Sequence, residues 1–247
     1  MTVHILSSSL RYESTNILRM RWPLAQGDVM LVKHWMTTSA LTVHEDISLM
    51  KASRLMKEHH VKHLPVLRKD RLVGIISDRD IKEAQPSKAT LLDVHELHYL
   101  LDRIKAKDVM TAKPYSTSAG EIVERAANLM LEHDISALPV VNEEGELDGI
   151  VTRGDLFHAM IAISGIKQAQ LQFGAQVKDR AGAVKELTDL IRMHGGRVVS
   201  ITTHHEDEPD GFLHIYIRCK EIENEESLFA ELEVKAKVLY RAHYKLD

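Results

Sequence analysis

The sequence contains a single cysteine, Cys219, and no long run of uncharged apolar residues. One cysteine excludes a disulfide within the chain and fits a reducing compartment. The longest apolar candidate, Leu156 to Ile166, has 11 residues and includes His158, whereas a membrane helix needs roughly 18. The N-terminus has no continuous apolar stretch of the kind that secretory signals contain. We therefore expect a soluble, cytoplasmic protein with no membrane partner.

The charge balance also lacks a basic excess. The 247 residues have a formal net charge of −4 and a pI of about 6.4, so no nucleic-acid partner is expected. Hydrophobic residues make up 44% and charged residues 28%, which is the composition of a globular protein rather than a disordered or fibrous one. A chain of this length holds one large or two small domains.

What the sequence does contain is an internal repeat. The segment 35–37 (Trp-Met-Thr) recurs as 109–111 (Val-Met-Thr), and 64–67 (Leu-Pro-Val-Leu) recurs as 138–141 (Leu-Pro-Val-Val), at an offset of 74 residues. Five further identities share this offset: Ala52, Leu55, Met56, Glu58 and His59 match Ala126, Leu129, Met130, Glu132 and His133. Ordered identities over this length indicate two copies of one structural unit.

A third pair of segments extends the repeat at a different offset. The run 74–80 (Gly-Ile-Ile-Ser-Asp-Arg-Asp) recurs as 149–155 (Gly-Ile-Val-Thr-Arg-Gly-Asp), 75 residues further on. One residue has therefore been added in between. It falls in 142–145 (Asn-Glu-Glu-Gly), where a turn tolerates an insertion.

Each copy has the pattern strand, helix, strand, turn, strand, helix. Ala52, Leu55 and Met56 are spaced as one apolar face of a helix. The apolar runs 64–67 and 73–76 flank a charged turn and predict two paired strands. The first of these strands contains a proline, which is expected at the start of a strand or on an edge strand.

These repeated motifs resemble a pair of CBS domains that form one Bateman module. The resemblance implies an α+β fold in which a linker helix joins the copies. Its apolar stripe would be Leu91, Val94, Leu97, Leu101 and Ile104, with Thr90 and Asp93 as a capping box. The expected limits are an N-terminal extension at 1–29 that matches neither copy, a first CBS domain at 30–84, the linker helix at 85–105, a second CBS domain at 106–160 and a linker at 161–168.

The remaining residues, 169–247, have a different pattern. Strands are expected at 170–177, 197–203, 212–218 and 237–244, and helices at 183–192 and 224–233. The resulting order βαββαβ is that of the ferredoxin-like split unit. Together with the turn Asp179-Arg180-Ala181-Gly182 it resembles an ACT domain, although alanine stands where that turn usually has proline.

The repeated motif Gly-x-x-[Ser/Thr]-x-x-Asp is the most informative for function. Ser77 and Asp80 in the first copy, and Thr152 and Asp155 in the second, stand where a strand leads into a helix, whose free N–H groups favour an anion. In similar modules these residues hold the ribose or phosphate of AMP, ADP, ATP or a related adenosine ligand. The alternative is that the motif only caps a helix.

Other positions of the CBS resemblance concern the base and the phosphates. Ala52 and Ala126 match small residues that line the adenine pocket of similar modules, although helix packing also favours small residues there. Lys62, His63 and Arg79 stand where relatives have basic residues facing phosphate. The second copy has different residues there: Ser136, Ala137 and Gly154. Two occupied sites would then differ in phosphate preference, unless these charges are only solvated surface.

The ACT resemblance implies a second ligand site. Amino acids bind in similar domains at the N-terminus of the first helix, usually at a dimer interface. The matching residues are Asp179, Arg180, Gly182 and Ala183. Many ACT domains serve only for assembly, so this alternative stays open.

Neither a metal site nor a catalytic nucleophile is predicted. His59 and His63 have the spacing of zinc ligands on one helix, but that helix is expected to end between them. A second group could meet across a hairpin: His204, His205 and His214. No cysteine or clear carboxylate completes either set. Cys219 stands at the end of the expected strand 212–218, and the sequence has no nucleophile elbow and no P-loop.

The sequence thus predicts a regulatory protein that is not an enzyme and requires no cofactor. An adenosine nucleotide would bind between the CBS motifs, while the ACT domain would bind an amino-acid-like effector or hold a homodimer. The protein target is unknown. The CBS–ACT order resembles AcuB-type proteins, whose family name refers to acetoin utilisation. Two alternatives remain: a structural dimerisation module without a small-molecule ligand, and an enzyme whose active site is unrecognised.

Overall fold

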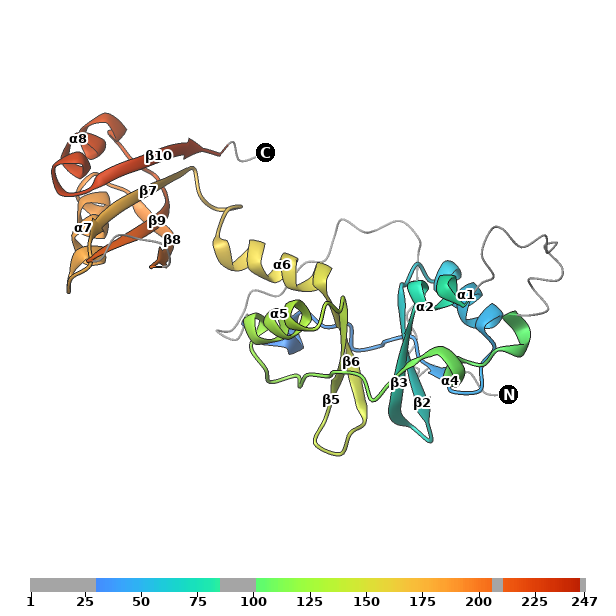
Figure 1. The fold of residues 1–247 in the computed structure, drawn as a ribbon. Helices are drawn as coiled ribbons and strands as arrows, with labels where there is room; N and C mark the ends of the chain where they lie inside the picture. The colour runs from blue at the N-terminus through green and yellow to red at the C-terminus, as the bar shows by residue number, and fades with distance from the viewer. Residues whose placement is uncertain (1–29, 85–100, 206–210, 245–247) are drawn as a thin grey trace. The chain divides into compact units, whose positions relative to one another are not determined.

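The computed structural model describes residues 30–84, 101–205 and 211–244. The chain divides into two compact units between Ala159 and Met160. The first unit contains both repeats and the second contains the C-terminal sheet (Figure 1). The expected N-terminal extension and residues 85–100 of the expected linker helix lie outside the described residues. No helix among the described residues has both the length and the apolar character needed to cross a membrane.

The first repeat contains the elements that its pattern predicts. They are a short 3-10 helix η1 (Val32–His34), β1 (Val43–His44), α1 (Leu49–Glu58), β2 (His63–Arg68), β3 (Arg71–Ser77) and α2 (Asp78–Glu83). Helix α1 begins after Ser48, whose hydroxyl accepts a hydrogen bond from the N–H of Lys51. The predicted apolar face is buried at Ala52 and Met56, so the helical periodicity of the sequence is confirmed here.

The second repeat follows the same plan. Its elements are α4 (Ala106–Val109), β4 (Thr111–Ala112), α5 (Val123–Glu132), β5 (Ala137–Val141), β6 (Leu147–Thr152) and α6 (Arg153–Ser164). The inserted residue lies in the turn between β5 and β6, as predicted. Gly145 has a φ of +79° in this turn, and Asn142 accepts a hydrogen bond from the N–H of Glu146 through Oδ1.

The prediction for Pro65 was wrong in part. Pro65 is the third residue of β2, which lies between β1 and β3 in the sheet. Proline is tolerated at this position because β1 pairs only with Val66 and Leu67. At Pro65 itself the strand has one neighbour, β3, through Ile75. Strand β2 thus lacks a neighbour on one side at Pro65, so the missing N–H of proline breaks no ladder hydrogen bond on that side.

The two repeats exchange short segments. Thr37 precedes the first repeat but pairs with Ile150 of the second, through N–H to O distances of 2.8 and 3.0 Å. Thr111 precedes the second repeat but pairs in β4 with Ile75 of the first. Each β-hairpin is thus extended by the segment that leads into the other repeat. This exchange makes the two repeats one unit.

The second unit has the predicted order βαββαβ. Its elements are β7 (Leu171–Lys178), α7 (Ala183–Met193), β8 (Arg197–His204), β9 (Phe212–Lys220), α8 (Glu225–Lys235) and β10 (Lys237–His243). The sheet order is β10-β7-β9-β8, with all neighbours antiparallel. Phe173 of β7 meets Phe229 of α8 edge to face, with ring centroids 5.4 Å apart. Helix α8 therefore packs on the sheet through a buried aromatic contact.

Gly149 allows a test of the segment exchange. A Cβ at Gly149 would lie 2.4 Å from the carbonyl oxygen of Thr37, a backbone atom that cannot rotate away. Gly149→Ala should therefore lower the free energy of unfolding by about 1–3 kcal/mol, the usual cost of overpacking. Gly120→Ala is the matched control, because nothing lies within 4 Å of the added methyl. Denaturant unfolding that gives both variants wild-type stability would contradict the importance of the exchange.

Candidate functional site

The repeated Ser/Thr-x-x-Asp motifs form two hydrogen-bonded turns, which we call the capping boxes. Asp80 Oδ2 accepts hydrogen bonds from the N–H and the hydroxyl of Ser77, at 2.6 and 2.7 Å. Asp155 Oδ2 accepts the same two bonds from Thr152, at 2.8 and 2.6 Å. The helix-capping alternative from the sequence therefore describes the local structure correctly at both sites.

Capping occupies only one oxygen, Oδ2, of each of the two carboxylates. In the part of the chain that the structure describes, Oδ1 of Asp80 and Oδ1 of Asp155 accept no hydrogen bond. An ionised carboxylate offers several acceptor positions. Each box thus presents one oxygen that is held in a fixed direction and can still accept from a ligand hydroxyl.

The two capping boxes flank a contact between the repeats. His63 Nε2 lies 2.9 Å from Ser136 Oγ. His63 is the β-ladder partner of Ser77, and the carbonyl of Ser136 accepts a hydrogen bond from the N–H of Arg153, the residue after Thr152. A ligand that reaches across this contact could therefore touch both boxes.

The predicted phosphate-facing residues are arranged unequally. Lys62 and Arg79 are exposed, and neither side chain forms an ion pair with another described residue. Arg153, the basic residue nearest the second box, donates to the carbonyls of Ile135 and Met130 at the end of α5, at 2.8 and 3.4 Å. Within the described ranges, the first box thus has neighbouring cations without an ion-pair partner, whereas Arg153 beside the second box is already bound.

The two predicted adenine-pocket alanines are core residues. Ala52 and Ala126 have exposed fractions of 0% and 1%, and Ala52 packs in the hydrophobic core of the first repeat. Ala126 also lines a pocket, but Thr152 and Asp155 do not. Helix packing accounts for a small residue at both positions, so the structure does not bring the alanines into one site with the capping boxes.

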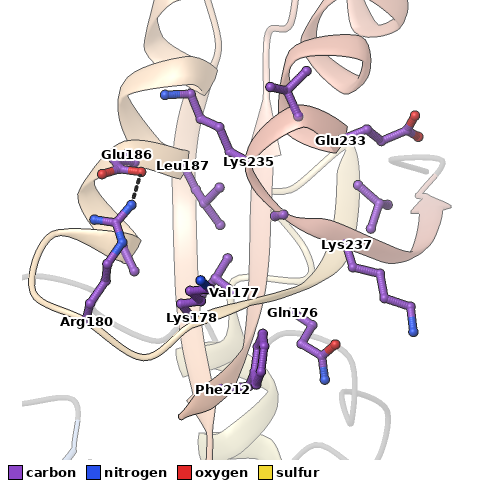
Figure 2. A pocket seen from close by; sticks show the side chains of 14 residues that line it. Gln176, Val177, Lys178, Arg180, Glu186, Leu187, Phe212, Glu233, Lys235 and Lys237 are labelled. Atoms are coloured by element: carbon purple, nitrogen blue, oxygen red, sulfur yellow. Dashed lines mark hydrogen bonds and ion pairs between the residues drawn. The ribbon is translucent and has the colours of Figure 1, made fainter.

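The second unit contains a pocket of about 610 Å³ near the start of α7. Two of the four predicted effector residues, Arg180 and Ala183, line it. Figure 2 shows Arg180 paired with Glu186, and Glu233 and Lys237 across the pocket. Its charged lining residues are Lys178, Arg180, Lys235 and Lys237 against Glu186 and Glu233. Sequence reasoning missed the three lysines, which the turn motif does not include.

The other two predicted effector residues have structural roles. Asp179 is not in the pocket lining; its Oδ2 lies 3.8 Å from His205 Nδ1. Gly182 is the N-cap of α7 with a φ of +87°, a conformation that glycine adopts without strain. The turn therefore needs glycine for its backbone, whether or not a ligand binds.

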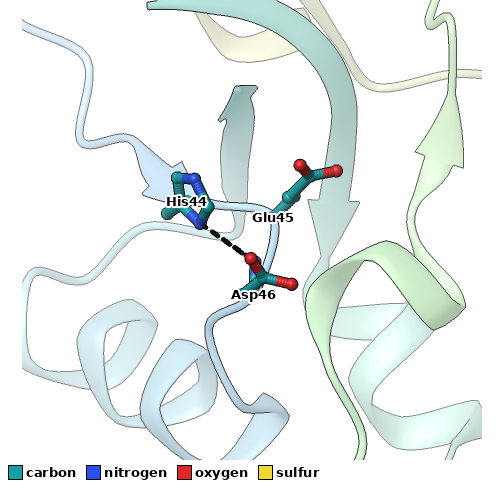
Figure 3. Close-up of side chains that lie close together, drawn as sticks. All are labelled: His44, Glu45 and Asp46. Carbon is teal, nitrogen blue, oxygen red and sulfur yellow. Dashed lines mark hydrogen bonds and ion pairs between the residues drawn. The ribbon is translucent and has the colours of Figure 1, made fainter. Parts of the chain in front are cut away.

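A group of possible metal ligands lies next to β1, where His44, Glu45 and Asp46 have ligand atoms within 4.8 Å of one another (Figure 3). Arg68 binds both carboxylate oxygens of Glu45, and Lys107 Nζ lies 2.7 Å from Asp46 Oδ1. Both carboxylates thus already have cationic partners. The fit to a metal is poor.

The other histidines that the sequence singled out, and the cysteine, form no reactive centre with other described residues. His204 and His214 are partners across β8 and β9, as the hairpin predicts. His59 ends helix α1 as its C-cap, and His63 begins β2. Cys219 is buried in β9, and burial raises the pKa of its thiol to about 12. It is therefore not a nucleophile at neutral pH.

Burial of His63 predicts a pH effect on stability. Burial lowers the pKa of His63 below 6.5, although Asp78 and Asp80 oppose this. As pH falls below 6.5, the folded state thus binds fewer protons than the unfolded state. The free energy of unfolding therefore decreases between 6.5 and the lower pKa of His63 in the folded state, by up to about 1.4 kcal/mol per pH unit. Urea unfolding from pH 7.5 to 5 should show a shallower loss for His63→Gln. Equal pH slopes would mean that burial does not hold His63 neutral.

Comparison with known proteins identifies the repeats. The family model described as the CBS domain matches residues 32–87 and 106–162. An uncharacterized protein of Methanocaldococcus jannaschii is 36% identical over 55% of this chain and 94% of its own length. A CBS domain-containing protein of Dictyostelium discoideum is 32% identical over 54% of this chain and 93% of its own length.

Other similarities are less complete. The chain covers only 20–34% of longer relatives such as inosine-5'-monophosphate dehydrogenases and homoserine O-acetyltransferases. The structure of a Vibrio cholerae protein described as an acetoin utilization protein (AcuB) is 28% identical, over 54% of this chain and 91% of that one, with a TM-score of 0.45. We draw no conclusion from so low a score. The family model and the two relatives matched over nearly their full length show that this chain belongs to the CBS domain family.

Proposed function

We propose that this protein is a regulator without catalytic activity that binds an adenosine nucleotide beside its two capping boxes. The observation that supports this most is the duplication itself. Two boxes, each with one carboxylate oxygen free of other described residues, flank the side-chain contact of His63 with Ser136. A helix needs only one acceptor oxygen for its cap, so capping alone gives no reason for both boxes to meet where the repeats touch.

The chemistry of the boxes suits a phosphorylated ribose. A ribose has two neighbouring hydroxyls that can donate to Oδ1 of Asp80 or of Asp155, and hydrogen bonds to an ionised carboxylate are among the stronger ones. Lys62 and Arg79 would face the phosphates, where Arg and Lys discriminate between chains of different charge. If both boxes bind, we expect AMP, ADP and ATP to rank differently at the two, because only the first box has available cations.

We further propose that the second unit is an ACT domain. The sheet order and the turn at Gly182 support this assignment. Its pocket has four cations and two carboxylates, which suits the carboxylate of an amino-acid-like effector. We also propose that the chain forms a homodimer, as proteins with either domain commonly pair. A role in acetoin utilisation is supported only by the resemblance of the CBS–ACT order to AcuB-type proteins.

Nucleotide binding would act by stabilising the contact between the repeats. A ligand that binds at one box and also contacts the other repeat favours the arrangement in which the two repeats lie together. At 100 times its Kd it adds about 2.7 kcal/mol of stability. Coupling to a second ligand would be reciprocal and typically about 1–3 kcal/mol.

The competing proposal is a structural module without a small-molecule ligand. It is favoured by the fact that both boxes already satisfy their helix ends. The two proposals differ in one measurable quantity, the heat of binding of adenosine nucleotides.

The central prediction concerns Asp80 and Asp155. Calorimetry should show AMP, ADP or ATP binding to the wild type, loss of one site in Asp80→Ala or Asp155→Ala, and no binding when both are changed. Asp108→Ala is the matched control, because Asp108 also accepts from a backbone N–H at a helix start, at 2.9 Å, and lies in neither box. Each variant loses hydrogen bonds to a carboxylate at a helix start, and a typical hydrogen bond contributes about 0.5–1.5 kcal/mol to stability. Absence of binding to the wild type at millimolar nucleotide would support the structural module instead.

A second prediction concerns the phosphates. Lys62→Ala with Arg79→Ala should weaken ATP binding at least about tenfold, because a hydrogen bond to a charged group contributes about 1.5–3 kcal/mol. Adenosine binding should change little, and the salt dependence of ATP binding should flatten. Lys69→Ala with Arg71→Ala removes the same charge at the other end of the β2–β3 hairpin and should leave ATP binding unchanged. Equal ATP affinities in all three proteins would rule out the phosphate role.

A further inference from the structure

The two repeats differ at the place where Arg68 meets Glu45. In the first repeat the Nε and Nη2 of Arg68 donate to the two carboxylate oxygens of Glu45, a residue with an exposed fraction of only 8%. At the offset of 74 residues the second repeat has Asn142 and Ala119 instead. These two side chains cannot form an ion pair.

A pocket of about 830 Å³ lies at this place in the second repeat. Ala119 and Asn142 both line it, together with residues 116–121, one side of α5 and the turn after β5. The second repeat therefore has a pocket at the positions that form an ion pair in the first. The first repeat thus shows what kind of group fits there, namely a guanidinium held by a carboxylate.

The charges around the pocket favour a cation. Its acidic lining residues among those described are Glu121, Glu132, Glu143, Glu144 and Asp148. The basic residue in the described part of the lining is Arg125, whose Nη1 lies 3.5 Å from Glu121 Oε2. Among the described residues no cation pairs with Glu143, Glu144 or Asp148. A concave surface with excess charge of one sign raises the local concentration of the opposite ion.

This pocket is separate from the capping boxes. Its lining includes neither Thr152 nor Asp155. It lies at the Val141 end of β5, whereas the contact with His63 lies at Ser136, just before the strand begins. Five residues of extended chain separate the two places by roughly 16 Å. A ligand in this pocket and a nucleotide at the boxes would therefore bind at different sites.

We propose that the pocket binds a small organic cation with a guanidinium or primary ammonium group, which takes the place that Arg68 occupies in the first repeat. A planar guanidinium has five donors and is weakly hydrated, so it can pair with the carboxylates that line the pocket. The volume fits a small molecule rather than a bare metal ion. This site does not depend on the proposed nucleotide function.

Agmatine, which has both cationic groups, is the probe, and n-butylurea is its uncharged counterpart. Calorimetry on the full chain at low ionic strength should show agmatine binding and no binding of n-butylurea. Ala119→Glu with Asn142→Arg installs the ion pair of the first repeat and should weaken agmatine binding at least tenfold. ATP binding by this variant should stay at the wild-type level.

A second variant keeps the pocket open and removes charge. Glu143→Gln with Asp148→Asn should also weaken agmatine binding, whereas Glu226→Gln, which changes an exposed acid on α8, should not. The proposal is overturned if the wild type does not bind millimolar agmatine. It is also overturned if n-butylurea binds equally well, or if both pocket variants keep wild-type affinity.

Discussion

The antiparallel pairing of Thr37 with Ile150 is the contact on which the first unit depends. Together with its counterpart, Thr111 with Ile75, it joins each β-hairpin to the segment that leads into the other repeat. Neither hairpin has its full set of strand partners unless both repeats are folded. The same exchange sets the two hairpins side by side (Figure 1), so the strands that end at Ser77 and Thr152 stop at the contact between the repeats.

The two repeats share a backbone plan but differ in their side chains, and the differences described here involve charged residues. The first repeat has exposed cations at the capping box and fills the far end of its hairpin with Arg68 and Glu45. The second repeat uses Arg153 to hold the end of α5 and leaves an acidic pocket at the far end of β5. Among the described residues, the two copies thus share the capping box but differ at the far end of the hairpin, which holds an ion pair in the first repeat and a pocket in the second.

The sequence predicted most of the elements because they depend on local patterns. Apolar spacing predicted α1, α5 and the βαββαβ order, and the Ser/Thr-x-x-Asp spacing predicted both boxes. It could not predict that Thr37 would pair with a strand more than 100 residues away, because strand pairing between distant segments leaves no mark in local periodicity. The position of Pro65 in an inner strand and the lysines around the pocket of the second unit also depend on distant segments, so local patterns did not predict them. The open pocket of the second repeat could have been suspected from the sequence, since Ala119 and Asn142 replace an oppositely charged pair at the repeat offset.

The central claim is that adenosine nucleotides bind at the two capping boxes, beside the contact that joins the repeats. Hydrogen exchange followed by mass spectrometry, with and without saturating ATP, tests it without any substitution. Slower exchange is expected both in residues 76–80 and in residues 151–155, with helix α7 unchanged as an internal reference. Unchanged exchange at both boxes, or slowing confined to the second unit, would contradict the account.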